Sequence, residues 1–203
     1  MAPRPRGPRT VSLPRILSRV DTPDLYRSLA VESWLLDQGP GPEPVLFLWR
    51  APPAVVMGKN QNPWRECNLE VVAERGLLLA RRETGGGAVY HDPGNLNLCW
   101  AMPRDDYDPD RLHGVLTGTL DALGVAAGVR KGGAVWASGR KVSGCAFGSR
   151  WRMVLHHATL LVDADLATLK AALAPPRVRV KTHAVDSIPA PVANLGELDP
   201  GLT

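Results

Sequence analysis

The sequence has no apolar run of about eighteen residues or more, so it offers no candidate for a membrane-spanning helix. It also has few cysteines. Cys67, Cys99 and Cys145 are odd in number and far apart, which argues against a disulfide framework and favours a reducing compartment. Their spacing matches no zinc motif, and we predict no metal site. These absences predict a soluble protein that does not contact membranes.

Aromatic residues make up only 5% of the chain, and 24 basic residues against 20 acidic ones leave a net charge of only +4. The basic residues occur as scattered short pairs without interleaved aromatic side chains, so we predict no binding of nucleic acid. With 203 residues, of which 44% are hydrophobic, the chain can form a globular core, and this composition excludes intrinsic disorder.

The two ends of the chain differ from its middle. Residues 1–20 contain five arginines, four prolines and no acidic residue, and we expect a flexible basic segment there. We expect residues 21–203 to form one catalytic domain. Its last thirty residues or so mix prolines with short apolar runs, which predicts irregular chain with one or two short elements.

Hydrophobic periodicity predicts an α+β fold with a central mixed or antiparallel sheet flanked by helices. Predicted helices cover 24–37, 69–75, 109–123 and 165–173. Residues 45–49 and 54–57 are expected to pair as a hairpin-like unit. Further strands are predicted at 77–82, 88–91, 95–102, 134–138, 140–146 and 152–162.

A glycine triplet, Gly85-Gly86-Gly87, follows the pair Arg81-Arg82 between two predicted strands. Glycines permit positive φ and let backbone N–H groups approach a ligand closely, while arginines suit phosphate or carboxylate groups. The alternative is a bulged turn with solvated arginines. Neither GxGxxG nor GxxxxGK[ST] occurs here, so the Rossmann and P-loop signatures are absent.

Lys141 lies among glycines and small residues, either as a surface lysine on a hairpin or as a cation in a site. Ser138 and Lys141 fit the SxxK pattern of penicillin-recognising hydrolases, but no SDN or KTG motif follows. Cys145 is a buried thiol or a nucleophile for which the sequence identifies no base. His156 and His157 are adjacent, so a strand directs them to opposite faces and only one of them belongs to a site.

Four separated motifs, GKNQNPWRECN, RRETGGGAVYHDPGNLN, GRKVSG and LHHATLLVDADL, occur in one order. This series resembles the lipoate-protein ligase A family, and its spelling is similar to that of the mitochondrial lipoyltransferases. The resemblance implies the catalytic-domain fold that the family shares with biotin ligases. It also implies a two-step reaction, in which lipoate and ATP give lipoyl-AMP and a lysine of a lipoyl domain then accepts the lipoyl group.

The resemblance implies roles for residues that match family positions. Lys141 would be the catalytic cation between the acyl carbonyl and the phosphate, where it stabilises developing negative charge. The implied lipoyl-adenylate and ATP site also contains Arg81, Gly86, Gly87, Ala88 and Val89. The implied pocket contains His91, Asn95, Ser143, Gly144 and His157. We expect the alternating strand around Leu96 and Leu98 to line an apolar slot for the lipoyl chain.

Two departures from the family pattern bear on the ATP step. The Asn-Asp pair that handles Mg²⁺ and ATP in self-sufficient ligases is replaced by Gly132-Gly133-Ala134-Val135, although Asp92 could supply a carboxylate. The chain also ends soon after the catalytic domain, so we expect no C-terminal accessory domain. ATP and Mg²⁺ are therefore implied only for a full ligase, and lipoate or lipoyl-AMP is the implied substrate.

The implied partners are apo lipoyl domains, either of E2 subunits or of the glycine cleavage H protein, with a possible separate accessory protein. The expected compartment is the cytoplasm, or the mitochondrial matrix if the source is eukaryotic. Three alternatives remain open from the sequence: a biotin-protein ligase, an octanoyltransferase that works through Cys145, and a binder of lipoyl domains without activity.

Overall fold

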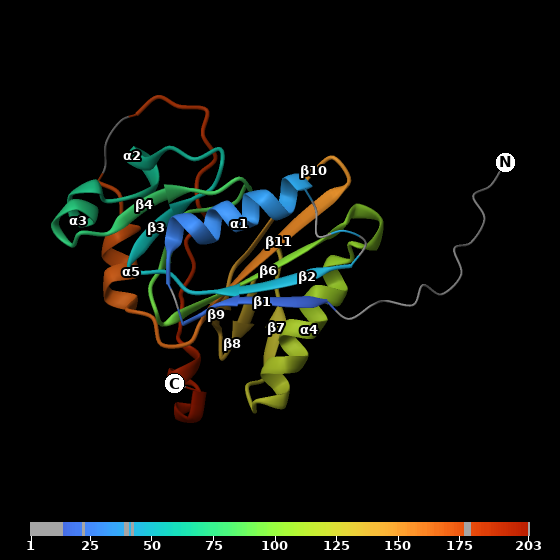
Figure 1. The fold of residues 1–203 in the computed structure, drawn as a ribbon. Helices are drawn as coiled ribbons and strands as arrows, with labels where there is room; N and C mark the ends of the chain where they lie inside the picture. Colours follow the sequence, from blue (N-terminus) through green and yellow to red (C-terminus); the bar gives the residue numbers. More distant parts are fainter. Residues whose placement is uncertain (1–13, 22, 39–40, 42, 177–179, 203) are drawn as a thin grey trace.

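The computed structural model describes residues 14–21, 23–38, 41, 43–176 and 180–202. Its largest sheet has five strands in the order β1-β2-β6-β11-β10 (Figure 1). β1 and β2 are parallel, and the other neighbours are antiparallel. The predicted α+β class and mixed sheet are confirmed. The five strands are β1 (Arg15–Arg19), β2 (Val45–Trp49), β6 (Asn95–Pro103), β10 (Cys145–Arg150) and β11 (Met153–Leu161).

Two three-stranded sheets accompany the central sheet, one in the order β4-β3-β5 and the other in the order β7-β8-β9. The first of these sheets carries the glycine loop between β4 and β5, and the second carries Lys141 on β9. Their strands are β3 (Ala54–Met57), β4 (Leu78–Arg81), β5 (Val89–His91), β7 (Ala127–Val129), β8 (Val135–Ala137) and β9 (Arg140–Ser143).

The helices begin where a polar side chain caps free N–H groups. Asn62, Asn68, Asp108 and Asp165 each accept from backbone N–H groups of the first turn that follows. The helices are α1 (Leu25–Gln38), α2 (Pro63–Glu66), α3 (Leu69–Glu74), α4 (Pro109–Ala122) and α5 (Leu166–Ala172), with 3₁₀ turns η1 (Arg104–Asp106), η2 (Leu195–Glu197) and η3 (Pro200–Leu202). The predicted short elements near the C-terminus are η2 and η3.

Three apolar clusters fill the interior. One joins α1 to β2 and β6, the second joins α4 to the strands around β8, and the third joins α3 and α5 to β3. Figure 1 shows α1 and α4 on different sides of the central sheet, and the red C-terminal segment running past the β3–β4 sheet toward β9. None of the helices formed by the described residues has the length and apolar character needed to cross a bilayer.

Three local predictions are wrong. Strands β2 and β3 do not pair with each other, because the turn through Pro52 and Pro53 carries the chain from one sheet into another. The strand predicted at 140–146 divides at Gly144, so that β9 and β10 belong to different sheets. Residues 15–19, predicted to be flexible, form β1 because their backbone pairs with β2. The rest of the predicted tail, 1–13, lies outside the described residues.

Candidate active site

The glycine triplet forms the loop between β4 and β5, and only Gly86 of the three has a positive φ, of +86°. A Cβ on Gly86 would lie 2.9 Å from Nη2 of Arg82, and a Cβ on Gly58 would lie 2.1 Å from the carbonyl oxygen of Gly86. Within the described parts of the chain, the N–H groups of Gly86 and Gly87 donate no hydrogen bond. Both groups are available to a ligand, and their role as an anion site stays a prediction.

Arg82 lies beneath this loop and is only 8% exposed. Its guanidinium donates to the carbonyl oxygens of Gly85 and Gly87, the latter at 2.9 Å, and its Nε donates to Oγ1 of Thr84 at 3.2 Å. Burial lowers the pKa of Arg82 to about 10, so the side chain stays charged at neutral pH. A buried cation therefore holds the glycine loop in shape.

Arg81, which the resemblance assigned to the adenylate, faces elsewhere. Its Nη1 donates to the carbonyl oxygens of Gly58 and Gln61, both at 2.8 Å, and to that of Lys59 at 3.1 Å. Successive residues of a strand point to opposite faces, so only one arginine of the pair can face the cavity beside the loop. That residue is Arg82, and the assignment of Arg81 does not fit this geometry.

Lys141 lies on β9, held by the C-terminal segment. Its N–H donates to the carbonyl oxygen of Pro191 at 2.8 Å, and its own carbonyl accepts from Ala193 at 3.1 Å. Its Nζ would lie 3.1 Å from a Cβ on Gly144 and makes no hydrogen bond or ion pair with any described residue. Burial lowers the pKa of Lys141, partly offset by the nearby Cys145. Lys141 is therefore a partly buried cation without a partner among the described residues.

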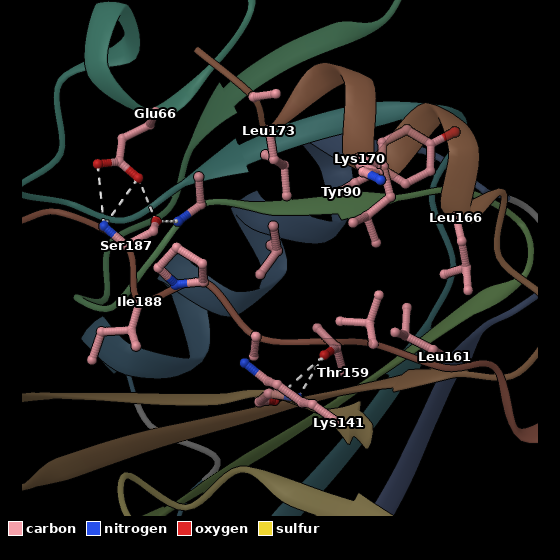
Figure 2. Close-up of a pocket in the computed structure, with 18 of the residues that line it drawn as sticks. Glu66, Tyr90, Lys141, Thr159, Leu161, Leu166, Lys170, Leu173, Ser187 and Ile188 are labelled. Carbon is pink, nitrogen blue, oxygen red and sulfur yellow. Dashed lines mark hydrogen bonds between the residues drawn. The ribbon is translucent and has the colours of Figure 1, made fainter. Parts of the chain in front are cut away.

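Two cavities, of about 700 Å³ and about 530 Å³, meet at Lys141. Figure 2 shows the first, with Lys141 and Thr159 on one side and Glu66 and Ser187 on another. The shared boundary combines the end of the glycine loop, the β9 lysine and the C-terminal segment. Its residues are Ala88, Val89, Lys141, Gly144, Thr159, Asp186, Ser187, Ile188, Pro189 and Ala190.

The two cavities differ in their surroundings. The smaller one extends inward to Trp49, Val56 and His91, each at most 3% exposed. The larger one extends along α5, where it meets the apolar side chains of Leu166, Leu169 and Leu173, among others. The smaller cavity thus has an enclosed inner end, whereas the larger one follows α5, whose side chains Leu166, Lys170 and Leu173 border it (Figure 2).

All five residues predicted for the pocket line one cavity or both. His91 and His157 line the smaller cavity, Asn95 and Ser143 the larger one, and Gly144 lines both. The predicted apolar slot at Leu96 and Leu98 is wrong, because Leu98 packs against the α4 cluster on the opposite face of the sheet and the alternation of β6 directs Leu96 to that same face. The cavity-facing members of β6 are Asn95 and Asn97.

The larger cavity has two buried polar atoms that lack a partner. Asn95 Oδ1 and Ser143 Oγ accept and donate no hydrogen bond, although their residues are at most 1% exposed. The amide of Asn95 is oriented by Nδ2, which donates to Nδ1 of His91 at 2.8 Å. Burial lowers the pKa of His91 to about 3, which keeps that ring neutral and able to accept. Unpaired buried polar atoms are costly, so these two favour a polar ligand in the larger cavity.

No sequence pattern pointed to Ser187, which lies in irregular chain. Its Oγ accepts from the N–H of Ala88 at 2.9 Å and from Nε2 of Gln61 at 3.0 Å, and donates to Glu66. The C-terminal segment is thereby attached to the glycine loop. In this arrangement the N–H of Ala88, predicted to bind the adenylate, is bonded to the protein itself.

His157 connects α1 to the glycine loop. Its Nδ1 lies 3.1 Å from Oε1 of Glu32, and its Nε2 lies 3.0 Å from Oγ1 of Thr84. Because Arg82 already donates to Thr84 Oγ1, the threonine hydroxyl is free to donate to Nε2, which leaves the ring proton on Nδ1 facing Glu32. This chain of hydrogen bonds from Arg82 through Thr84 thus sets the tautomer of His157.

Carboxylates near the cavities are already engaged. Glu32 accepts from Trp49, Glu66 from Ser187, and Asp186 pairs with Arg65 at 2.8 Å. Asp92, the substitute expected for a metal, accepts from the N–H groups of Gly94 and Asp165. Ala134 lines the smaller cavity without any oxygen to offer. This set of residues does not fit a Mg²⁺ site, because Mg²⁺ is held through carboxylates that are free to coordinate it.

A family model for the lipoyl protein ligase A/B catalytic domain matches residues 24–203. Mitochondrial lipoyl amidotransferases LIPT1 from mouse and from human are each 39% identical to the chain. The mouse match covers 89% of this chain and 49% of that protein, and the human match covers 96% and 53%. The chain therefore spans about half the length of these curated relatives.

Solved structures agree with this match. LipL1 of P. falciparum, solved with lipoate, is 30% identical with a TM-score of 0.83 over 94% of this chain and 57% of that one. A lipoate-protein ligase A bound with ATP is 30% identical with a TM-score of 0.76 over 92% and 77%. A bipartite ligase from Thermoplasma acidophilum, studied with its E2 lipoyl domain, is 30% identical with a TM-score of 0.73 over 91% and 75%.

The chain belongs to the lipoyl protein ligase A/B catalytic-domain family. The predicted family and fold are confirmed by the family model and by these structures. The relatives from mouse and human are mitochondrial by name.

Proposed function

We propose that this protein transfers a lipoyl group from lipoyl-AMP to a specific lysine of an apo lipoyl domain. The observation that carries the proposal is the position of Lys141, whose ammonium has no partner in the described parts of the chain and lies where two cavities meet beside the glycine loop. A mixed anhydride has an apolar acyl chain and a polar nucleotide joined at one reactive carbonyl. Two unlike cavities that share a cation suit such a molecule.

The lipoyl chain occupies the smaller cavity in this proposal. Its enclosed end is bounded by Trp49, Val56 and Leu29, which suits an apolar chain that gains free energy from leaving water. The nucleoside occupies the larger cavity, where Asn95 Oδ1 and Ser143 Oγ offer unsatisfied polar atoms. The phosphate then lies at the junction, near the free N–H groups of Gly86 and Gly87.

The chemical step follows from this placement. The acceptor amine attacks the acyl carbon, the bond from that carbon to the phosphate oxygen breaks, AMP leaves as an anion, and the extra proton of the amine passes to solvent. Negative charge grows on the carbonyl oxygen and then on the departing phosphate. One cation about 4 Å from either oxygen contributes up to roughly 4 kcal/mol at an effective dielectric constant near 20. Lys141 is placed to supply that charge.

The engaged carboxylates favour transfer over activation of lipoate with ATP, since each acidic side chain among the described residues that line the cavities already has a partner and none is free for Mg²⁺. An acyl-enzyme on Cys145 is also disfavoured. Burial raises the pKa of this thiol, against the opposing effect of Lys141, and its Sγ lies 3.2 Å from the carbonyl oxygen of Gly132. A protonated thiol is a poor nucleophile. We therefore do not propose an octanoyltransferase reaction through Cys145.

For partners, we propose apo lipoyl domains of E2 subunits or the H protein, a proposal supported by the E2 lipoyl domain studied with the archaeal relative. The three free cysteines suit a reducing compartment, either the cytoplasm or the mitochondrial matrix. A separate accessory protein would be needed only if lipoate is activated elsewhere.

The proposal is tested by mixing the protein with preformed lipoyl-AMP and an apo lipoyl domain, and by measuring the intact mass of the acceptor. We expect one lipoyl group per acceptor, and none on an acceptor whose target lysine is replaced by arginine. Unmodified acceptor over the same period, with a folded enzyme, would contradict the proposed transfer. Modification by biotinyl-AMP at an equal rate would contradict the assigned acyl group.

A further inference from the structure

A second group of reactive side chains lies beside the proposed active site. Donor atoms of His113, Cys145 and His156 lie within 4.8 Å of one another. They come from α4, β10 and β11, so no sequence spacing could have revealed them. The absence of zinc-like spacing in the sequence predicted no metal site, but the fold brings two imidazoles and a thiol together.

His113 gives the first sign of a ligand. Its Nε2 is buried and has no hydrogen-bond partner. A Cβ on Gly133 would lie 2.8 Å from this nitrogen and 2.4 Å from Sγ of Cys145. Only a glycine can therefore close the turn above these two atoms, and both donors face the same small space beneath it.

His156 is oriented as a metal ligand would be. Its Nδ1 lies 2.9 Å from the hydroxyl oxygen of Tyr107, and its ring crosses that of His113 with centroids 5.3 Å apart. Histidine ligands usually bond through one ring nitrogen to a neighbouring acceptor, which fixes the ring and frees the other nitrogen. Tyr107 thus leaves Nε2 of His156 as the free donor atom.

In a second cluster, the donor atoms of Glu32, Cys99 and His157 also lie within 4.8 Å of one another. Its members are already used, because Glu32 Oε1 accepts from Trp49 and contacts His157, and His157 contacts Thr84. The cluster around His113 has a free nitrogen, whereas this one has none left over. We therefore select the His113 cluster.

We propose that His113, Cys145 and His156 bind one divalent transition-metal ion, with Zn²⁺ as the preferred metal. Cysteine thiolate and histidine imidazole are both donors that Zn²⁺ binds in proteins. Tetrahedral Zn²⁺ sites place such donors roughly 3.5 Å apart, and the three donor atoms here already lie within 4.8 Å of one another. The Gly132 carbonyl oxygen, 3.2 Å from Sγ, or a water completes the shell. Cys145 lines the smaller cavity, which provides the entry path.

Co²⁺ titration tests the proposal, because Co²⁺ replaces Zn²⁺ in such sites and a Co²⁺–thiolate bond absorbs light. The chelator-treated full chain should bind one equivalent of Co²⁺ with a thiolate band, and Zn²⁺ should displace it. Cys145→Ser should abolish the band, while His113→Asn and His156→Asn should weaken Co²⁺ binding about tenfold or more. All histidines and cysteines of the chain lie in described residues, so no histidine or cysteine of unknown position could supply the metal ligand instead.

Two matched controls locate the site. His183→Asn changes an exposed histidine, and Cys99→Ser removes the thiol of the second cluster. Both should keep the band at full intensity. A wild-type chain without a saturable band, a band that survives in Cys145→Ser, or a band lost in Cys99→Ser would overturn the assignment.

A measurement on the unmodified chain covers the case in which a variant does not fold. Iodoacetamide labelling of Cys145, followed by peptide mass spectrometry, should slow about tenfold or more when one equivalent of Zn²⁺ is added. Mg²⁺ at the same concentration should not change the labelling rate. Equal labelling with and without Zn²⁺ would contradict the site, whatever the variants show.

Discussion

Lys141 is the only cation among the described residues that line both cavities. Replacing Lys141 by alanine should leave the chain folded and slow lipoyl transfer about a hundredfold or more, equivalent to about 3 kcal/mol of transition-state stabilisation. Single-turnover transfer from lipoyl-AMP measures this. Arg140→Ala is the matched control, because that neighbour pairs with Glu197 away from the cavities and should retain its rate. Equal rates for the two variants would remove Lys141 from the reaction.

Substitutions of the two adjacent arginines should differ sharply in their effect on binding of the adenylate. Arg82→Gln removes the hydrogen bonds to Thr84, Gly85 and Gly87 in the glycine loop, so we expect binding of a non-hydrolysable lipoyl-AMP analogue to weaken about tenfold or more. Arg81→Gln affects only the turn at residues 58–61, and its affinity should stay within about threefold of wild type. Calorimetry measures the affinity of both variants for the analogue. A larger loss of affinity in Arg81→Gln than in Arg82→Gln would restore the assignment of Arg81.

At this scale the sequence motifs pointed to residues that line the cavities, but not to the geometry between them. The glycine triplet was predicted from its residue types, and Lys141 and the five pocket residues from the resemblance that the order of the motifs carries, because both are local properties of the sequence. The choice between Arg81 and Arg82 depends on which face of β4 meets the cavity, which a pair of identical residues does not encode. Ser187 and the unpaired atom of Asn95 depend on contacts between distant segments.

At the scale of elements, the glycine loop allows a test with an internal control. Gly86→Val would force a branched side chain into a positive φ and place its Cβ 2.9 Å from Arg82 Nη2, so binding of the lipoyl-AMP analogue should be lost with a modest loss of stability. Gly85→Ala meets nothing within 4 Å and should bind within about threefold of wild type. Calorimetry and urea unfolding separate the two effects. Undiminished binding by Gly86→Val would reduce the loop to a structural turn.

Helices and strands were easier to predict than the pairing of strands. Periodicity and capping residues are local, and α4 begins at Pro109 after Asp108 as its sequence indicates. Strand partners are set by contacts between distant residues, so β2 and β3 were wrongly paired with each other. The same reason explains β1, where a basic, proline-containing segment adds to the edge of the sheet through its backbone.

At the scale of the whole molecule, buried histidines make stability depend on pH. Burial lowers the pKa of His91 to about 3 and that of His156 to about 4, from 6.5. A lowered folded-state pKa means that the unfolded chain takes up the proton first, so stability is full above pH 6.5 and falls as the pH drops toward these values. At pH 5 each histidine should cost about 2 kcal/mol of unfolding free energy.

Urea unfolding with a chelator present, at pH 7.5 and pH 5, measures this loss. His156→Asn should lose less stability over this range than the wild-type chain. His183→Asn, which changes an exposed side chain, should lose as much as wild type. Identical losses in all three proteins would show that His156 accepts its proton in the folded state.

The most direct test of transfer, as opposed to complete ligation, compares two donors on one acceptor. Preformed lipoyl-AMP in one reaction, and lipoate with ATP and Mg²⁺ in the other, are given to the same apo lipoyl domain under single-turnover conditions. Because the carboxylates near Lys141 are engaged and Ala134 supplies none, transfer from lipoyl-AMP should be faster by about tenfold or more, equivalent to about 1.4 kcal/mol. Equal rates from both donors, together with Mg²⁺-dependent release of pyrophosphate, would contradict this account and make the chain a complete ligase.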